Sequence, residues 1–205
     1  MPKYLNSSEN EVFKKGKELY GFHEVLKNNR NLKKILVVEG YTDVLSLFSN
    51  KISYAVATLG IATSKIHLEK LFGCVDEVVF CFDGDEAGMK AAESAMKISL
   101  PTIKDGKILK FLFLPDAHDP SSLLEDEGRD EFEERLDKAM VLSDYIFNLI
   151  LNKHGNSIEE KAAASKEFMS LISPMPSSNY KNILMQEFSK KVDIKLEAEN
   201  KKNPE

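Results

Sequence analysis

The chain has 205 residues, of which 42% are apolar, and its 28 basic and 33 acidic side chains give a formal net charge of −5 at pH 7. This is the composition of a globular protein, and the acidic balance argues against nucleic-acid binding driven by bulk charge. No apolar stretch approaches the roughly 20 residues of a membrane span, and the first thirty residues carry no signal-peptide core, so we expect a cytoplasmic protein without membrane association. Two cysteines, Cys74 and Cys81, are too few for a disulfide scaffold, and with four scattered histidines they predict no zinc site.

Four short apolar runs predict buried strands. They cover residues 33–39, 54–58, 77–82 and 109–114, and a glycine or proline follows each of them closely. Between the predicted strands, apolar residues recur at helical intervals. They form three sets: Val44, Leu47 and Phe48; Ile66, Leu68, Leu71 and Phe72; and Ala87, Ala91, Ala95 and Ile98. Met89 and Met96 on the third of these helices are predicted to fill the core. The alternation predicts an α/β fold with a mostly parallel, Rossmann-like sheet of about four strands.

From about residue 129 the pattern is helical only. Ser143 is the predicted N-cap of a helix whose apolar face includes Tyr145 and Ile146. A last helix, with Leu184, Phe188 and Val192 on one face, follows the break at Pro174 and Pro176. These helices predict a small bundle after the sheet domain.

Acidic residues follow three of the four predicted strands. Glu39 closes the first strand, Asp83 and Asp85 follow the third, and Asp116 and Asp119 follow the fourth. Functional groups gather at the carboxyl ends of the strands in open parallel sheets, and carboxylates so close repel one another unless a cation lies between them. Oxygen ligands alone suit Mg²⁺ or Mn²⁺ better than zinc. We therefore predict a divalent-metal site at this edge.

Each acid also has an ordinary structural interpretation. Asp83 or Asp85 is suited to cap the helix that begins near Glu86, and a charged residue such as Glu39 is common at a strand end. The run from Asp119 to Asp137, with nine acids and two arginines, is by default a solvated face. The combination of three strand ends favours the metal site over these interpretations.

Other residues carry weaker signals. Thr58 and Gly60 would let the backbone approach a phosphate, although a tight strand-to-helix turn is the more common explanation of such residues. Asp43 lies one helical turn after Glu39, where it is either an outer acid of the site or a residue favoured by the helix dipole. His118 is predicted to be an exposed loop histidine.

The ordered motifs resemble those of a toprim domain and, more narrowly, of the bacterial replicative primases. The motifs that carry the resemblance are residues 38–44 (VEGYTDV), 57–60 (ATLG), 82–88 (FDGDEAG), 113–116 (FLPD) and 119–120 (DP). The lead-in is similar as well, at residues 3–7, 15–16 and 19–21, and so is the helical tail from Phe132 to Phe188. A lone Asp-Gly-Asp would be weak, whereas this ordered set is specific and extends over nearly the whole chain.

The resemblance implies the catalytic core of a primase, a DNA-directed RNA polymerase that copies single-stranded DNA into short RNA primers from ribonucleoside triphosphates. By that resemblance Glu39, Asp83 and Asp85 are the catalytic and metal-binding residues, with two Mg²⁺ or Mn²⁺ ions between them, and Asp43, Asp116 and Asp119 are further acids. It implies three parts: a lead-in at 1–32, a toprim domain at 33–120 and a helical subdomain at 121–205.

Two departures from the family pattern stand out. Ser121 occupies a place where relatives often have an acid, so the outer part of the site is expected to be less acidic than usual. The family's zinc-binding domain, basic lobe and C-terminal helicase-binding domain are expected to be absent, and the replicative helicase is expected to bind through that missing C-terminal domain. The chain is then expected to be a monomeric fragment with weak activity of its own.

Two other functions fit the same acids. A phosphatase would use Asp83 as a nucleophile, although such enzymes carry their Asp-x-Asp motif after the first strand and here it follows the third. A metal- and nucleotide-binding module without independent activity is the other alternative.

Overall fold

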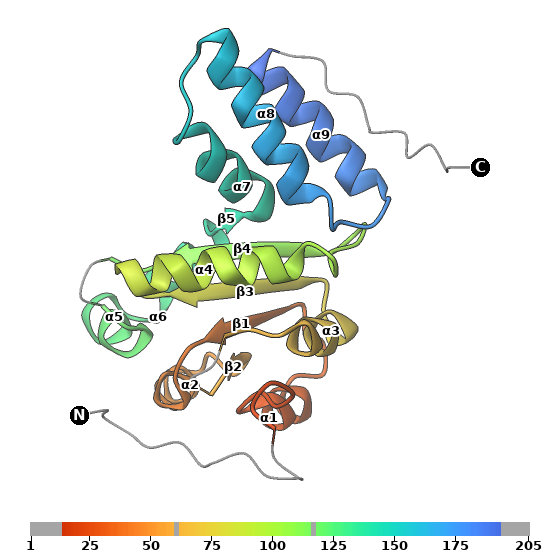
Figure 1. Ribbon diagram of the computed structural model, residues 1–205. Helices are drawn as coiled ribbons and strands as arrows, with labels where there is room; N and C mark the ends of the chain where they lie inside the picture. Colours follow the sequence, from red (N-terminus) through yellow and green to blue (C-terminus); the bar gives the residue numbers. More distant parts are fainter. Residues whose placement is uncertain (1–13, 60–61, 116–117, 194–205) are drawn as a thin grey trace. The chain divides into compact units, whose positions relative to one another are not determined.

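The computed structural model describes residues 14–59, 62–115 and 118–193, so Gly60 and Asp116 among the predicted site residues lie outside the described part. The chain divides into two units, one ending at Leu142 and one starting at Ser143 (Figure 1). The two units divide about twenty residues after the expected boundary at 120/121, which stays a prediction.

In the first unit, strands and helices alternate along the chain (Figure 1). Its elements are α1 (Phe22–Asn28), β1 (Lys34–Val38), α2 (Tyr41–Ser49), β2 (Ala55–Ala57), α3 (Lys65–Cys74), β3 (Glu77–Phe82), α4 (Glu86–Ser99), β4 (Ile108–Phe113), α5 (Pro120–Glu127), α6 (Arg129–Asp137) and β5 (Met140–Val141). The strand order is β2-β1-β3-β4-β5, with β4 and β5 antiparallel and the other neighbours parallel. This confirms the α/β class and the mostly parallel sheet.

The sheet forms because its central strands are apolar on both faces. In β1 the four residues Ile35 to Val38 are all buried, and in β3 the five residues Val78 to Phe82 are buried as well. Residues that alternate along these strands belong to opposite faces. Leu36, Val38, Val79 and Cys81 join one core cluster with residues of α2, α5 and α6. On the other face, the rings of Phe80, Phe82 and Phe111 stack against one another.

The chain reverses its direction across the sheet between β1 and β3. From β1 it passes through α2 to β2 on one side, and from β2 it returns through α3 to β3 on the other side. Because parallel crossovers are right-handed, α2 covers one face of the sheet, and α3 and α4 cover the opposite face. Such a switch point opens a crevice at the carboxyl ends of the two strands, which is where open α/β sheets bind their ligands.

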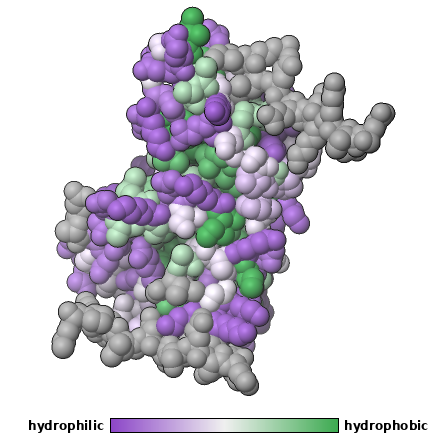
Figure 2. Space-filling view, viewed as in Figure 1, coloured by the Kyte–Doolittle hydropathy of each residue, from purple (hydrophilic) through white to green (hydrophobic). Residues whose placement is uncertain are grey.

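Burial corrects several details of the predicted helices. The buried face of α4 is made by Gly88, Ala92, Ala95, Met96 and Ser99. Of the predicted face, Ala95 is therefore confirmed, while Ala87 and Ala91 were wrong. Met96 is buried as predicted, but Met89 is 47% exposed. Phe48 and Ile66 also lie at the solvent-exposed edge of their helices rather than in the core. On the face shown in Figure 2, hydrophobic residues of this kind are interspersed among hydrophilic ones.

The fifth strand, β5, was not predicted. It has two residues, Met140 and Val141, that pair with Phe111 and Lys110 of β4. A segment this short has no alternating pattern of its own, and only the neighbouring strand makes it a strand. The expectation of about four strands and of helices alone after residue 129 is corrected accordingly.

Up to residue 193, where its described part ends, the second unit consists of three helices, α7 (Leu142–Leu151), α8 (Ile158–Ile172) and α9 (Asn179–Val192). Helix α7 begins one residue before Ser143, the predicted cap. Phe147, Phe168 and Phe188, one from each helix, form the aromatic centre, where the rings of Phe168 and Phe188 stack with centroids 3.9 Å apart. The predicted last helix and its face of Leu184, Phe188 and Val192 are confirmed, since all three are buried. Within the described ranges no helix combines the length and the apolar character needed to cross a membrane.

We expect Phe168→Ala to destabilise the second unit by about 3–5 kcal/mol, because it removes a fully buried ring from the aromatic centre. The matched control on the same helix is Ile158→Ala, whose side chain is 82% exposed and whose loss should change the free energy of unfolding by less than about 0.5 kcal/mol. Urea unfolding of both variants measures the difference. Equal effects would show that the three rings do not hold this unit together.

Candidate active site

The carboxyl ends of β1 and β3 bring the predicted acids to one edge of the sheet. Glu39 follows β1 directly, and Asp83 follows β3, its parallel neighbour. Neighbouring carboxylates lie close enough to Glu39 and Asp83 to raise the pKa values of both. Burial raises the pKa of Glu39, and the carboxylates of Asp83, Asp85 and Asp43 raise it further. Burial likewise raises the pKa of Asp83, together with Asp85 and Asp119.

Three of these five acids also cap helices that start at this edge. Asp85 is the N-cap of α4, and its Oδ1 accepts a hydrogen bond of 2.7 Å from the Gly88 N–H. Asp43 accepts from the Gly40 N–H at the start of α2, at 3.1 Å. The cap interpretation of Asp85 is therefore confirmed. The helix ends also direct partial positive charge towards the acids, which lessens the cost of gathering them.

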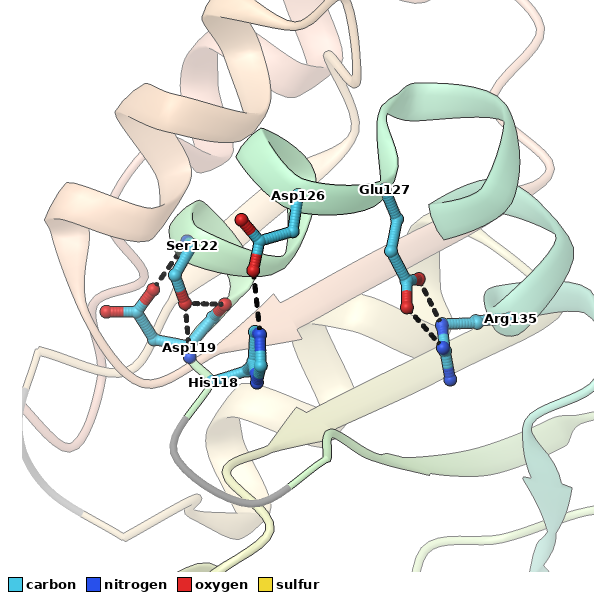
Figure 3. Close-up of polar contacts among 6 residues, drawn as sticks. All are labelled: His118, Asp119, Ser122, Asp126, Glu127 and Arg135. Carbon is cyan, nitrogen blue, oxygen red and sulfur yellow. Dashed lines mark hydrogen bonds and ion pairs between the residues drawn. The ribbon is translucent and has the colours of Figure 1, made fainter.

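Asp119 caps α5 through a reciprocal pair of hydrogen bonds (Figure 3). Its Oδ1 accepts from the Ser122 N–H at 2.8 Å, and the Ser122 Oγ accepts from the Asp119 N–H at 3.0 Å. His118 lies within 3.0 Å of Asp126 on the last turn of the same helix. These contacts attach the segment after β4 to α5. The Asp119 carboxylate then lies close enough to Asp83 to raise its pKa.

The next helix braces α5 in turn. Arg135 of α6 donates two hydrogen bonds to Glu127, from Nε at 2.6 Å and from Nη2 at 2.5 Å (Figure 3). On its other side α5 meets α2, where the Ser121 Oγ donates to the Ser46 Oγ at 2.9 Å. Ser121, which departs from the family pattern, is thus engaged in helix packing.

Glu39 and Asp83 differ from the capping acids. Within the described residues, neither carboxylate has a hydrogen-bond or ion-pair partner, so their repulsion is not offset by a nearby donor. The donor set is all carboxylate oxygen, which suits a magnesium or manganese ion. In the described part of the chain, however, no three His, Cys, Asp or Glu side chains are arranged so that they could hold a metal ion. The fold therefore brings together the charges, while the assignment of ligands stays a prediction.

The remaining predicted residue of the site, Thr58, follows β2 and is buried, and its N–H donates to the Val38 carbonyl at 3.4 Å. Leu59 after it has a left-handed backbone, with φ of 61°, which is uncommon for a residue with a side chain. This strained turn is compatible with a backbone approach to a ligand, the role predicted for Thr58 and Gly60.

Two features of the site region escaped the sequence analysis. A Cβ at Gly88 would lie 2.1 Å from the Asp83 carbonyl oxygen, so only glycine lets α4 approach the Asp83 loop this closely. His67 is fully buried and hydrogen-bonded, although the sequence suggested only scattered histidines. The spacing of Ser64 and His67, an N-cap and the third residue after it, was the available signal.

Comparison with known proteins agrees with this geometry. A family model described as Toprim-like matches residues 36–124, which contain β2, β3, β4, most of β1 and all the predicted acids. Models described as the N-terminal domain of the DNA primase catalytic core and as the DnaB-helicase binding domain of primase match residues 1–26 and 143–197. The first unit is thus a toprim-type domain.

Individual relatives identify the branch of this class. A DNA primase of Pseudomonas aeruginosa is 46% identical over 190 residues, which are 92% of this chain and 29% of that protein. The crystal structure of a DNA primase domain from Pseudomonas aeruginosa has a TM-score of 0.91 at 43% identity, covering 95% of this chain and 61% of that one. A structure of the DnaG primase catalytic domain bound to ssDNA has a TM-score of 0.87 at 41% identity, covering 92% and 61%. The chain belongs to the bacterial DNA primase family, and it spans about a third of the length of the curated relatives it matches.

One expectation derived from the resemblance is corrected by these matches. A helicase-binding segment was expected to be absent, but the model with that description matches residues 143–197, which include α8, α9 and all of α7 except its first residue. The error arose because the pattern of three short amphipathic helices predicts a bundle but contains no motif that indicates which partner the bundle binds.

Because the folded state raises the pKa values of Glu39 and Asp83, it binds protons more readily than the unfolded chain, and the repulsion costs stability once both are ionised. Asp83→Asn is therefore expected to raise the melting temperature of the metal-free protein at pH 7. The gain should shrink as the pH falls to about 4, where protonation relieves the repulsion in the unsubstituted protein. Thermal unfolding with a chelator measures it, with Glu125→Gln on the exposed surface of α5 as the control. A lower melting temperature for Asp83→Asn at pH 7 would contradict the repulsion between these carboxylates.

Gly88→Ala is expected to destabilise the first unit by about 1–3 kcal/mol, because the added methyl group collides with the Asp83 backbone. Gly73→Ala in α3 is the matched control. No atom lies within 4 Å of its added methyl group, so alanine should stabilise the helix by roughly 0.5–1 kcal/mol. Amide hydrogen exchange at residues 83–88 localises the effect. If both variants are stabilised, the close packing at Asp83 is wrong.

Proposed function

We propose that this chain is a catalytic part of a DNA primase that makes short RNA primers on single-stranded DNA by nucleotidyl transfer from ribonucleoside triphosphates. The observation that carries the proposal is the set of acids at the ends of three adjacent strands, at the switch point of the sheet. The relatives that share this fold over nearly the whole chain are DNA primases. We further propose that it acts in the cytoplasm at the replication fork.

In this proposal Glu39, Asp83 and Asp85 hold Mg²⁺, with Asp43, Asp116 and Asp119 around them. When bound, a pair of ions would lower the pKa of the primer hydroxyl and neutralise charge on the triphosphate. The roles of the chain's own residues differ. Asp85 and Asp119 use one carboxylate oxygen each for a helix cap, which fixes their orientation, whereas Glu39 and Asp83 carry raised pKa values and no hydrogen-bond partner in the described structure. The last two are therefore the acids whose charge a cation would relieve most.

The net charge of −5 is compatible with this function. The acidic run from Asp119 to Asp137 contributes nine acids and two arginines, and residues 1–30 contain six basic and four acidic residues. The lead-in is thus the more basic end of the chain, and template affinity is expected to depend on parts of the longer relatives that this chain does not match. By itself the chain would bind metal and synthesise primers weakly.

Two partners follow from the similarities. The neighbour solved with ssDNA supports single-stranded DNA as the template. The match of residues 143–197 to a helicase-binding model supports the replicative helicase as a partner of the second unit.

We expect Asp83→Asn to reduce primer synthesis at least about 100-fold in a full-length primase that contains this chain, since it removes charge from the reacting centre. The amide is nearly the size of the carboxylate, and the same variant is expected to be more stable without metal, so lost activity would not reflect unfolding. Glu125→Gln should leave the rate unchanged. The assay is incorporation of ribonucleotides on a single-stranded template at saturating Mg²⁺.

A near-normal rate of Asp83→Asn would overturn the proposed role of this acid. A covalent aspartyl-phosphate trapped on the unsubstituted protein would favour a phosphatase instead. Metal and nucleotide binding without primer synthesis, even by the full-length protein, would leave the chain a binding module.

A further inference from the structure

The N-cap residue of α3, Ser64, and two residues of the helix, His67 and Lys70, form hydrogen bonds with three successive backbone carbonyls of the turn at residues 15–17. The Ser64 Oγ donates to the Gly16 carbonyl at 2.6 Å. His67 Nε2 lies 3.0 Å from the Lys15 carbonyl, and the Lys70 Nζ donates to the Lys17 carbonyl at 2.5 Å. The three side chains recur at intervals of three residues, so they share one face of the helix. The interaction is therefore a line of hydrogen bonds between a helix and a turn some fifty residues away in sequence.

His67 is at the centre of this line, and its protonation state is determined by its neighbours. Its Nδ1 accepts a hydrogen bond of 3.3 Å from the Ser64 N–H, so its Nε2 carries the proton and donates to the Lys15 carbonyl. The ring is fully buried, and burial lowers its pKa, as does the Lys70 ammonium, while the Lys15 carbonyl and Glu18 act in the opposite direction. Glu18 and Lys70 themselves lie 3.6 Å apart. The neutral ring thus joins the start of α3 to the turn through both nitrogens.

The turn lies at the same edge of the sheet as the acids. Tyr20 pairs antiparallel with Ala57 at the outer edge of β2, with hydrogen bonds of 2.9 and 3.1 Å. Because the pairing is antiparallel, the residues before Tyr20 run past the carboxyl end of β2. Helix α3 also starts at that end, after the loop that follows β2. Two independent contacts, the bridge and the line of hydrogen bonds, therefore fix the turn beside the catalytic edge.

The turn brings basic residues to an edge that otherwise carries acids. Lys14, Lys15 and Lys17 lie within four positions, and Glu18 is the only acid next to them. Template, primer and triphosphate all present phosphates, so the location of these basic residues affects how well an anionic substrate is held next to the carboxylates. The three hydrogen bonds to the turn all involve backbone carbonyls. They fix the path of the backbone and do not engage the side chains of the turn.

We propose that His67 is a positioning residue, which holds the turn at residues 15–17 in place beside the acids and so sets the affinity of the site for substrate phosphates. The inference rests on the proposed function for its effect on substrates. The anchoring of the turn is independent of it. Ser64 and Lys70 complete the anchor, and the turn belongs to the segment 1–26 that matches the N-terminal domain of the primase core.

The test compares variants of a full-length primase that contains this chain. His67→Phe keeps a ring in the buried position but removes both hydrogen bonds, and His67→Gln retains an N–H donor for the Lys15 carbonyl. His23→Phe, at an exposed position on α1, is the control. Lys70→Met removes one hydrogen bond at a partly exposed position, so it provides a variant that folds if the buried one does not.

We expect His67→Phe to speed hydrogen exchange at the amides of Glu18 and Tyr20 at least tenfold and to raise the KM for ribonucleoside triphosphates at least fivefold, with kcat within twofold. His67→Gln should restore most of both values, Lys70→Met should show smaller changes in the same direction, and His23→Phe should show none. Unchanged exchange and KM in His67→Phe and Lys70→Met, or a loss of kcat alone, would overturn the proposal. If the unsubstituted protein makes no primers, the proposed function fails, and the exchange measurement still decides whether His67 anchors the turn.

Discussion

Repulsion between carboxylates at the ends of β1 and β3 is the constraint on which the rest of the first unit depends. The parallel pairing of two strands that are buried along nearly their whole length leaves little freedom in where Glu39 and Asp83 lie. Both carboxyl groups are partly desolvated there and have raised pKa values, so the apolar sheet must supply the free energy that holds these charges together. Local instability of this kind is typical of sites built for function.

The surrounding helices are arranged so that this cost stays tolerable. Helices α2, α4 and α5 all begin at the acidic edge and are capped by Asp43, Asp85 and Asp119, so three acids satisfy backbone N–H groups in addition to adding negative charge. The close approach of α4 to the Asp83 backbone, which requires Gly88, keeps its N-terminus near the acids. Helix α5 is fixed in turn by α6 through Arg135 and by α2 through Ser46.

On the far side of β2, the turn at residues 15–17 is fixed in a different manner. Its contacts with Ser64, His67 and Lys70 are hydrogen bonds to backbone carbonyls, made by residues that no apolar pattern would identify. The acids and the basic turn thus reach the same edge by two routes, strand pairing for the first and side-chain hydrogen bonds for the second. The proposed polymerase activity requires both, since its site must hold cations and also anionic substrates.

The sequence by itself determined the four apolar strands, their order along the chain and the acids that follow them, because buried parallel strands are continuous apolar runs and their carboxyl ends share one edge. The motif order also pointed to the primase family, which the comparisons bear out. Only the tertiary structure decided the features that depend on contacts between distant segments: the two-residue strand β5, the buried face of α4, the steric need for Gly88 and the anchoring role of His67. Each of these is set by a neighbour dozens of residues away or by a close approach between backbones, and neither leaves a periodic signal in the sequence.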